Sequence, residues 1–243
     1  MKAFWCVPVE RTLNSNAVSA LFDVAALAAR HGVNRITMPY KRVDDARNSA
    51  SRIFWHHSDS DEDVLVMLDC DHVHPSHIVP HLVARCDAEH EVVAALAFRR
   101  SLPHDPCMYH VDASGATHSI PTSFTGEMMK CDIVGTGAIA IRRSAFRKLA
   151  ENGYQWPWFR FSYKDGFENE VQNSEDWNFG LACMKTGIAH WCDSSIITPH
   201  IDEYLVTPQS WFDVLMEGAK DPEAFSRKYE KLGMTLSVGE QAQ

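Results

Sequence analysis

Short apolar runs and longer amphipathic stretches alternate along the first hundred residues of the chain. The apolar runs are rich in β-branched residues, as strands buried on both faces are. The stretches between them repeat apolar residues at intervals of three and four, as helices packed against a sheet do. The strands expected from this pattern are 3–9, 35–40, 64–68 and 92–98, and the helices are 17–31, 43–56 and 76–86. Strands alternating with helices through short connections predict an α/β fold with a mostly parallel central sheet flanked by helices.

The second half of the chain begins with an irregular stretch. Residues 102–127 are rich in Pro, His, Ser and Thr and have no apolar period, so we expect a long loop that is functional or mobile. Strand character returns over 128–141, around two glycines. Further helices are expected from Ser144 to about Glu151, from about 173 to Thr186, and over a tail, 210–232, that Pro222 interrupts, with short strands at 189–192 and 195–198.

Length and composition restrict the class of protein. A chain of 243 residues is long enough for one large α/β domain. Its formal charge of −9 gives no overall attraction to nucleic acid or anionic lipid, although a local basic groove is compatible with it. The seven cysteines are scattered without a CxxC pair, which favours reduced thiols in the cytoplasm. No signal peptide or membrane-length apolar run is evident, so we expect a soluble cytoplasmic protein.

Two carboxylates, Asp69 and Asp71, directly follow the apolar run 64–68. In an open α/β sheet, ligands bind outside the carboxyl ends of the strands, so these side chains are expected to meet a ligand. Oxygen ligands at that edge suit a hard divalent cation that holds a phosphate group. The same spacing at Asp59 and Asp61 falls in a polar turn before the strand, where solvated loop charges are the better interpretation.

Each candidate has a structural alternative. Asp69 and Asp71 also suit a strand-end turn capped by Asp side chains. Glu175 and Asp176 open a predicted helix, where acidic residues offset the helix macrodipole whatever the function. His200, taken alone, is a lone loop histidine.

Four histidines lie close together in the sequence, at positions 72, 74, 77 and 81. His77 and His81 are four residues apart on one predicted helix face, a spacing that can hold zinc. Because no cysteine or acidic partner has the usual zinc spacing, a solvated helix face is the favoured interpretation. Whether this cluster binds metal stays open.

The segment Gly135–Ala140 fits the GxGxxG/A dinucleotide pattern. The residues after the glycines continue as a strand rather than a helix, and no acidic residue follows at the distance of a ribose contact. The glycines more plausibly let the backbone pass close to a ligand.

Six short segments occur in an order found in a known group of enzymes. They are VPV at the end of the first strand, ARN at a helix start, DCD, VGTGAIAIRRSAF, SEDWNF at a helix start, and PHI near residue 200. In this order the chain resembles the GT-A-fold glycosyltransferases, most of all the inverting family 2 enzymes, over about 3–201. The resemblance implies one catalytic domain, 1–243, with a nucleotide-binding half (1–100), an acceptor and metal half (101–202) and a helical tail (203–243).

The resemblance also implies how the donor and its metal are bound. Asp71 matches the residue of the DxD motif that binds Mn²⁺ or Mg²⁺, and Asp69 matches the one that contacts the ribose, or the metal through water. His200 matches a histidine that completes the metal shell in some members. The remaining donor-binding positions implied are Pro8, Val9, Glu10, Arg47 and Asn48, with Asp44 or Asp45 reaching the base.

The acceptor side is implied in the same way. Asp176, with Glu175 beside it, matches the carboxylate that acts as general base. The segment Gly135, Thr136 and Gly137 matches the part facing the acceptor and the donor sugar, and Trp177 belongs to the same side. The indoles of Trp156, Trp158 and Trp177 suit stacking on sugar or base, and suit core packing equally well.

These features predict a single sugar transfer from a UDP- or GDP-sugar to an acceptor hydroxyl, inverting by preference. The QxxRW element of processive members is absent, which argues against a polymer synthase. Two alternatives are a nucleotidyltransferase on a similar sheet, although the loop after the first strand has no glycine, and a non-catalytic sugar-binding or metal-binding domain. The donor base, the sugar, the acceptor, the stereochemistry and the oligomeric state are not readable from the sequence.

Overall fold

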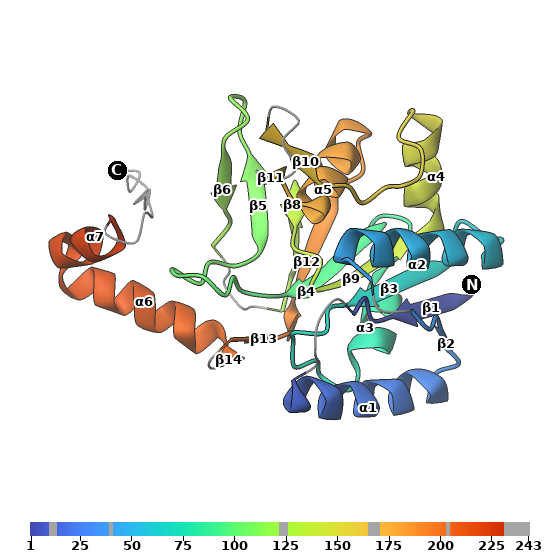
Figure 1. Ribbon diagram of the computed structural model, residues 1–243, viewed down its shortest axis with the longest axis horizontal. Helices are drawn as coiled ribbons and strands as arrows, with labels where there is room; N and C mark the ends of the chain where they lie inside the picture. Colours follow the sequence, from blue (N-terminus) through green and yellow to red (C-terminus); the bar gives the residue numbers. More distant parts are fainter. Residues whose placement is uncertain (10–13, 39–40, 122–125, 165–170, 203–204, 231–243) are drawn as a thin grey trace.

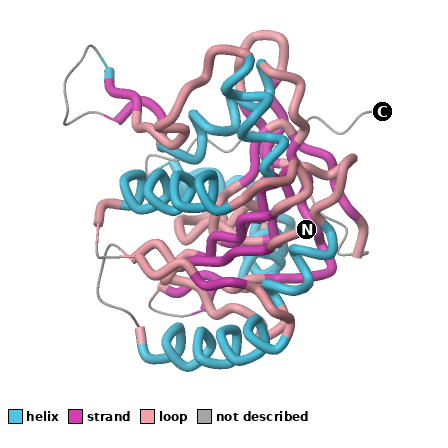
Figure 2. The backbone as a smooth tube through the Cα atoms, turned by 90° about the vertical axis from the view of Figure 1, so that its right-hand side faces the viewer, coloured by secondary structure: helices cyan, strands magenta, loops and turns pink. Residues whose placement is uncertain are grey.

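The computed structural model describes residues 1–9, 14–38, 41–121, 126–164, 171–202 and 205–230. A central sheet lies between two layers of helices (Figure 1; Figure 2). Its strands are β1 (Ala3–Cys6), β2 (Asn34–Arg35), β3 (Val64–Leu68), β4 (Val92–Leu96), β7 (Met128–Cys131), β9 (Ala138–Arg142) and β12 (His190–Ile197). The helices that cover them are α1 (Ser15–Arg30), α2 (Val43–His57), α3 (Ile78–Arg85), α4 (Arg143–Glu151) and α5 (Glu175–Lys185).

Five of the seven strands run in one direction, in the order β2-β1-β3-β9-β4-β12-β7. Strand β9 runs antiparallel between β3 and β4, and β7 runs antiparallel at the edge beside β12. The predicted mostly parallel sheet flanked by helices is therefore confirmed. The same topology brings the carboxyl ends of β1, β3 and β4 to one edge of the sheet, where ligands of open α/β sheets bind.

Every residue of β3 is fully buried, as its unbroken apolar run predicts. Leu65 and Met67 pack into the core beneath α2, α4 and α5, whereas Val64, Val66 and Leu68 pack into the core beneath α1 and α3. This alternation follows from the period of two along a strand. It fixes β3 rigidly, and with it the carboxylates that follow Leu68.

The prediction that residues 102–127 form one long loop is wrong for the centre of that range. The segment forms a hairpin, β5 (Met108–Val111) and β6 (Thr117–Ser119), which pairs with β8 (Ile133–Val134). Only Met108 of the two strands is buried, so the hairpin carries no apolar alternation that the sequence could reveal. Likewise, the two strands expected over 189–192 and 195–198 are one strand, β12, with a register shift between Asp193 and Ile197.

Two helix starts also differ from expectation. Ser76 does not cap α3, whose N-cap is His77, and Ser144 lies inside α4, where its hydroxyl donates to the buried Glu91 carboxylate.

Two further sheets have two strands each: β10 (Ser162–Tyr163) pairs with β11 (Val171–Asn173), and β13 (His200–Ile201) with β14 (Leu205–Val206).

The tail forms α6 (Pro208–Lys220) and α7 (Pro222–Glu230), with the break at Pro222 that the sequence predicts. Both helices extend to one side of the sheet (Figure 1). The ring of Trp211 packs at 6.2 Å from that of Phe98, which ties α6 to the end of β4. No helix among the described residues is long and apolar enough to cross a bilayer.

Candidate active site

A pocket of about 500 Å³ opens at the carboxyl end of β3. Residues from five separate segments line it, and those of four segments are acidic, basic or imidazole side chains. They are Asp69, Asp71 and His72 after β3, Arg47 from α2, Gly135–Gly137 before β9, Glu175 and Asp176 at the start of α5, and His200 on β13. The pocket thus gathers most of the residues that the sequence singled out.

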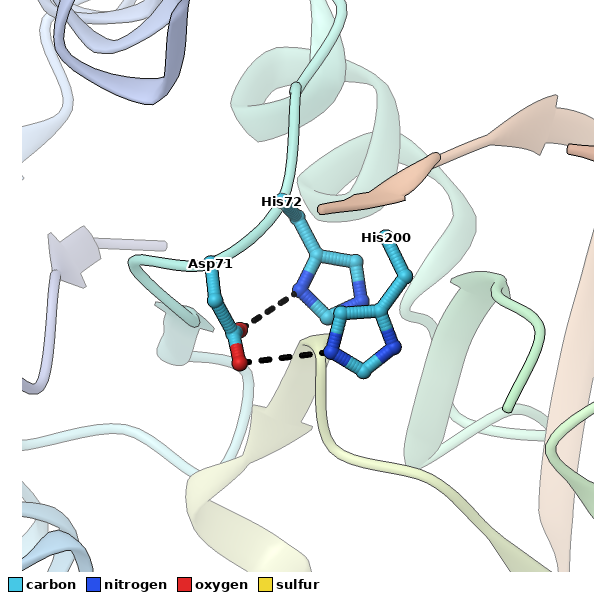
Figure 3. A group of neighbouring side chains, drawn as sticks. All are labelled: Asp71, His72 and His200. Carbon is cyan, nitrogen blue, oxygen red and sulfur yellow. Dashed lines mark hydrogen bonds and ion pairs between the residues drawn. The ribbon is translucent and has the colours of Figure 1, made fainter. Parts of the chain in front are cut away.

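Asp71, His72 and His200 form a compact group at one wall of the pocket. The carboxylate of Asp71 contacts both imidazoles, with Oδ1 at 3.1 Å from His72 Nδ1 and Oδ2 at 3.2 Å from His200 Nε2. Figure 3 shows the two rings stacked beside that carboxylate, and their centroids are 4.1 Å apart. Within the described residues, this is the group of His, Cys, Asp or Glu side chains whose donor atoms lie close enough to hold one metal ion.

The backbone fixes this group although 129 positions separate Asp71 from His200. The N–H of Ile201 donates to the Asp71 carbonyl at 2.8 Å, and the N–H of Val73 donates to the Pro199 carbonyl at 2.9 Å. The N–H of Asp69 donates to the Gly137 carbonyl at 2.8 Å. The loop after β3 is therefore held on both sides, so its side chains are preorganised.

The orientation of the His200 ring indicates what its Nε2 atom can bind. Its Nδ1 lies 3.1 Å from the carbonyl oxygen of Phe98, which only accepts, so Nδ1 carries the hydrogen. In the neutral ring, the lone pair of Nε2 then faces the Asp71 carboxylate, a second acceptor. Two acceptors in this position repel unless a cation or a proton lies between them.

This donor set fits a divalent cation. Neighbouring ligands of an octahedral ion with bonds of about 2.1 Å are about 3 Å apart, close to the 3.2 Å between His200 Nε2 and Asp71 Oδ2. Burial acts to raise the pKa of the Asp71 carboxyl, but hydrogen bonds and positive charge from the His200 and His72 rings, when these carry a proton toward it, outweigh burial and hold that pKa well below its ordinary value. Asp71 is therefore an anion at neutral pH, as a metal ligand must be.

Asp69 has a different partner from Asp71. Nη2 of Arg47 donates to both oxygens of Asp69, at 2.7 and 2.8 Å, and Nη1 of the same guanidinium contacts the Glu175 carboxylate. Arg47 is almost fully buried, and its charge is held between these two anions. The arginine therefore links the end of β3 to the start of α5, and Asp69 pairs with it rather than with the group around Asp71.

The two acidic residues at the start of α5 differ in environment. Burial raises the pKa of the Glu175 carboxyl to about 7, because desolvation together with the neighbouring charge of Asp176 outweighs the attraction of Arg47. Asp176 is half-buried and lines the pocket. Both hydrogen bonds that described residues donate to it, from Ser174 Oγ and from the Trp177 N–H, go to Oδ1. Its Oδ2 is thus available to a substrate proton.

The glycines before β9 make room for side chains. A Cβ on Gly137 would lie 2.7 Å from Nε2 of His72, and one on Gly135 would lie 2.8 Å from the Cβ of Cys107. The nearest atoms to these glycines in the structure thus belong to His72 and Cys107, whereas the sequence led us to expect a ligand there. Thr136, between the two glycines in the sequence, is buried and also lines the pocket.

The remaining donor-binding residues predicted from the sequence are divided by the structure. Pro8 lines the pocket, and the Val9 carbonyl accepts from the Lys41 N–H at 3.1 Å, while Glu10 lies outside the described residues. Asp45 and Asn48 line a different pocket, on the other side of α2. The amide of Asn48 is occupied by the backbone of Phe159.

Two of the three tryptophans considered for stacking pack against the protein. Trp177 lies outside the pocket lining, and its ring meets Tyr109 edge-on at 5.2 Å. Trp158 packs at 4.6 Å from Phe146. Trp156 is 43% exposed and lines the second pocket.

The four clustered histidines have four different environments. His72 belongs to the group with Asp71. His74 is buried and neutral, because Nε2 donates to the Asp69 carbonyl at 2.8 Å, Nδ1 accepts from Thr198 at 2.7 Å, and burial lowers its pKa to about 3. His81 contacts Asp193 at 2.9 Å, and His77 is exposed.

Sequence reasoning did not assign His72 and Arg100 to the site. Arg100 approaches Asp71 Oδ2 to 3.6 Å and lines the pocket. Their positions in the sequence could have indicated them. His72 directly follows the DCD segment, and Arg100 lies shortly after β4, the next strand of the central sheet along the chain.

No protein-family model matches this chain, and no curated protein matches it significantly. Among solved structures, protein A197 from STIV has 17% identity and a TM-score of 0.58, over 86% of this chain and 92% of its own. A Drosophila β-1,4-galactosyltransferase 7 mutant in complex with manganese, UDP-Gal and xylobiose has 13% identity and a TM-score of 0.43, over 83% and 71%. The inositol-1-phosphate CTP transferase from T. maritima has 11% identity and a TM-score of 0.42, over 86% and 91%.

The similarity to A197 concerns the fold, since the identity is too low to carry an activity with it. Together with the observed sheet order, it confirms the expected fold class, an α/β fold of the GT-A type. The resemblance drawn from the sequence motifs thus holds at the level of the fold.

Proposed function

We propose that this protein is a metal-dependent glycosyltransferase that moves one sugar from a nucleotide-diphosphate sugar to an acceptor hydroxyl, by preference with inversion. The observation that carries the proposal is the position of the Asp71 carboxylate 3.2 Å from Nε2 of His200, in the same pocket as Asp176. A cation site and a carboxylate base in one pocket are what such a transfer requires.

Asp71 and His200 would hold the cation, with His72 either as a third ligand or as the donor that orients Asp71. A bound cation would neutralise the charge that develops on the departing nucleoside diphosphate. Imidazole nitrogen beside carboxylate oxygen suits Mn²⁺ better than Mg²⁺. We therefore expect Mn²⁺ as the preferred metal.

Asp176 is the proposed general base. An acceptor hydroxyl is a weak nucleophile until a carboxylate takes its proton, and Oδ2 of Asp176 is available for that step. Glu175 does not share the role, because Arg47 binds it directly. Arg47 holds both Asp69 and Glu175, and we assign to Asp69 the ribose contact that the resemblance implies.

The wider setting of the reaction follows from the same proposal. Residues 1–100 supply the nucleotide half, with Pro8 and Val9 beside the donor, and 101–202 supply the acceptor and metal half, with Gly135 to Gly137 facing both substrates. The seven cysteines all lie in the described residues and form no disulfide there, which supports a reducing compartment such as the cytoplasm. A UDP- or GDP-sugar is the expected donor class.

The deciding experiment is a donor panel of UDP-, GDP- and dTDP-sugars, measured for binding and slow hydrolysis with Mn²⁺ and with EDTA. The wild type should act on one donor only with the metal, and Asp71→Ala should abolish that turnover. Asp59→Ala is the matched control, since Asp59 has the same DxD spacing but is exposed in a turn. It should behave as the wild type.

Other outcomes would overturn the proposal. Release of pyrophosphate from a nucleoside triphosphate and a sugar phosphate, with no use of nucleotide-sugars, would make the protein a nucleotidyltransferase. Failure of every nucleotide and nucleotide-sugar to bind would leave a non-catalytic binding domain.

A further inference from the structure

A second pocket, of about 860 Å³, lies between α2 and the segment 156–163. It shares no lining residue with the pocket around Asp71. Successive residues of α2 divide between the two, since Arg47 faces the first while Asn48 and Arg52 line the second. The second pocket is therefore a separate site and has the volume of a small-molecule site.

The second pocket is positively charged in a chain whose formal charge is −9. Lys41, Arg42, Arg52 and Arg160 line it, against the acidic Asp44 and Asp45. Arg42 and Asp44 neutralise each other through two hydrogen bonds of 2.6 Å. Among the described residues, no carboxylate pairs with Lys41, Arg52 or Arg160, so their charges are available to an anion.

An aromatic surface lies beside these cations. Trp156 is 43% exposed, and its Nε1 donates to the Asn48 carbonyl at 3.1 Å, which fixes the orientation of the indole. The guanidinium of Arg52 lies 5.4 Å from the centre of this ring. A fixed, exposed indole offers the apolar face of a sugar a surface to stack on, and Arg52 is within reach of a charged substituent of that sugar.

The pocket is preorganised by Asn48. Its Nδ2 donates to the Phe159 carbonyl at 2.6 Å, and its Oδ1 accepts from the Phe159 N–H at 2.9 Å. These buried bonds clamp the aromatic segment to α2 before any ligand arrives. Such rigidity reduces the entropic cost of binding.

We propose that this second pocket binds a small anionic saccharide, a sugar that carries a phosphate or a carboxylate. The indole supplies the stacking surface, and Arg52, Lys41 and Arg160 supply the charge. A long polyanion suits the site less well, because the pocket is finite and the overall charge of the chain repels it. The site is independent of the proposed transfer reaction.

Isothermal titration tests this proposal on the full chain in EDTA, without nucleotide. The probes are glucose 6-phosphate, glucuronate, glucose, inorganic phosphate and a single-stranded oligouridylate. At least one of the two charged sugars should bind with a Kd of about 1 mM or tighter, and glucose and inorganic phosphate should each bind at least about tenfold more weakly. Which charged sugar binds identifies the anionic group.

Variants localise the binding. Arg52→Gln should weaken it about tenfold, since a charged hydrogen bond is lost at an exposed side chain that the fold does not need. Trp156→Ala should weaken it too. Arg30→Gln, an exposed cation at the end of α1, and Asp71→Ala should leave it unchanged.

Several results would overturn the proposal: no saturable binding of either charged sugar, equal binding of glucose or of phosphate alone, an unaffected Arg52→Gln variant, or tighter binding of the oligouridylate. Loss of binding in Asp71→Ala would place the sugar in the first pocket instead. If no nucleotide-sugar binds or is hydrolysed but a charged sugar still binds, only the proposed transfer reaction is rejected.

Discussion

Asp176 and Glu175 are neighbours in the sequence, yet their surroundings give them different chemistry. Asp176→Asn keeps the size and the hydrogen-bond acceptor of the side chain but removes its basicity. We expect kcat to fall about 10²- to 10⁴-fold, the usual contribution of a general base, while the Kd of the donor changes little. Steady-state kinetics and donor titration with Mn²⁺ present measure the two effects separately.

Asp112→Asn is a control for this change, because Asp112 is a carboxylate in the turn of the exposed β5–β6 hairpin. It should retain wild-type kinetics. If Asp176→Asn keeps more than about a tenth of the wild-type kcat, the base lies elsewhere.

Gly137 permits the position of His72, so its substitution tests the group around Asp71 without removing a ligand. In Gly137→Ala the new methyl group would lie 2.7 Å from His72 Nε2, and the buried imidazole must move. We expect Mn²⁺ affinity, measured by titration with electron paramagnetic resonance detection, to fall about 10- to 100-fold, as it does when a residue that orients a metal ligand is lost.

Gly115→Ala separates this effect from general strain. Gly115 has a φ of +84° but open space around its Cβ position. Its substitution should cost about 1 kcal/mol of stability and leave Mn²⁺ affinity unchanged. Equal Mn²⁺ affinity in the two variants would remove the proposed role of Gly137.

At the residue scale, the sequence shows where in the fold a side chain lies more readily than it shows which other side chains it contacts. Asp69 and Asp71 could be placed because a buried strand must end in a turn, and that turn lies at the ligand edge of the sheet. The bond between Arg47 and Glu175 spans 128 positions and depends on a tertiary arrangement of α2 and the start of α5 that no local pattern records. His72 escaped assignment because its orientation is set by Gly137, from a different segment.

At the scale of elements, α2 lines both pockets, with Arg47 in the first and Asn48 and Arg52 in the second. Asn48 holds the 156–159 segment to this helix through its two buried hydrogen bonds. Asn48→Ala leaves the N–H and carbonyl of Phe159 buried without those partners. We expect the free energy of unfolding to fall by about 2 to 3 kcal/mol, measured by urea denaturation.

Asn152→Ala is the comparison for this loss. Asn152 also donates to a backbone carbonyl, that of Lys148, but at an exposed helix end. Water replaces its bond, so the loss should be under about 1 kcal/mol. Equal losses in the two variants would show that the Asn48 clamp is not structurally special.

Elements were predictable where they are buried. Helices α1 and α2 and strand β3 were anticipated nearly to the residue, since each has a continuous pattern of apolar positions. Strands β5 and β6 were missed because only one of their residues, Met108, is fully buried. Edge hairpins of this kind are specified by pairing rather than by period.

At the scale of the whole molecule, buried histidines make stability depend on pH. His190 lies inside the sheet, stacked on Phe179, and among the described residues neither of its ring nitrogens has a hydrogen-bond partner. Burial lowers its pKa from the ordinary 6.5 to about 4. His74 shifts in the same direction, whereas Glu175, with its raised pKa, contributes in the opposite sense between its ordinary 4.5 and about 7.

The sign for His190 follows from proton binding. Above pH 6.5 the residue is neutral in both the folded and the unfolded chain. As the pH falls below 6.5, the unfolded chain takes up a proton that the folded chain refuses down to about pH 4, so stability is lost over this window. The loss approaches about 1.4 kcal/mol for each pH unit.

His190→Leu removes this titration and replaces an unpaired polar ring with an apolar side chain. Urea denaturation at pH 7.5, 6 and 5 should show a stability loss between pH 6 and 5 that is smaller than in the wild type by about 1.4 kcal/mol. His31→Leu, at an exposed position after α1, should keep the wild-type slope. Parallel slopes for the wild type and His190→Leu would mean that the acid sensitivity of the fold arises from other groups.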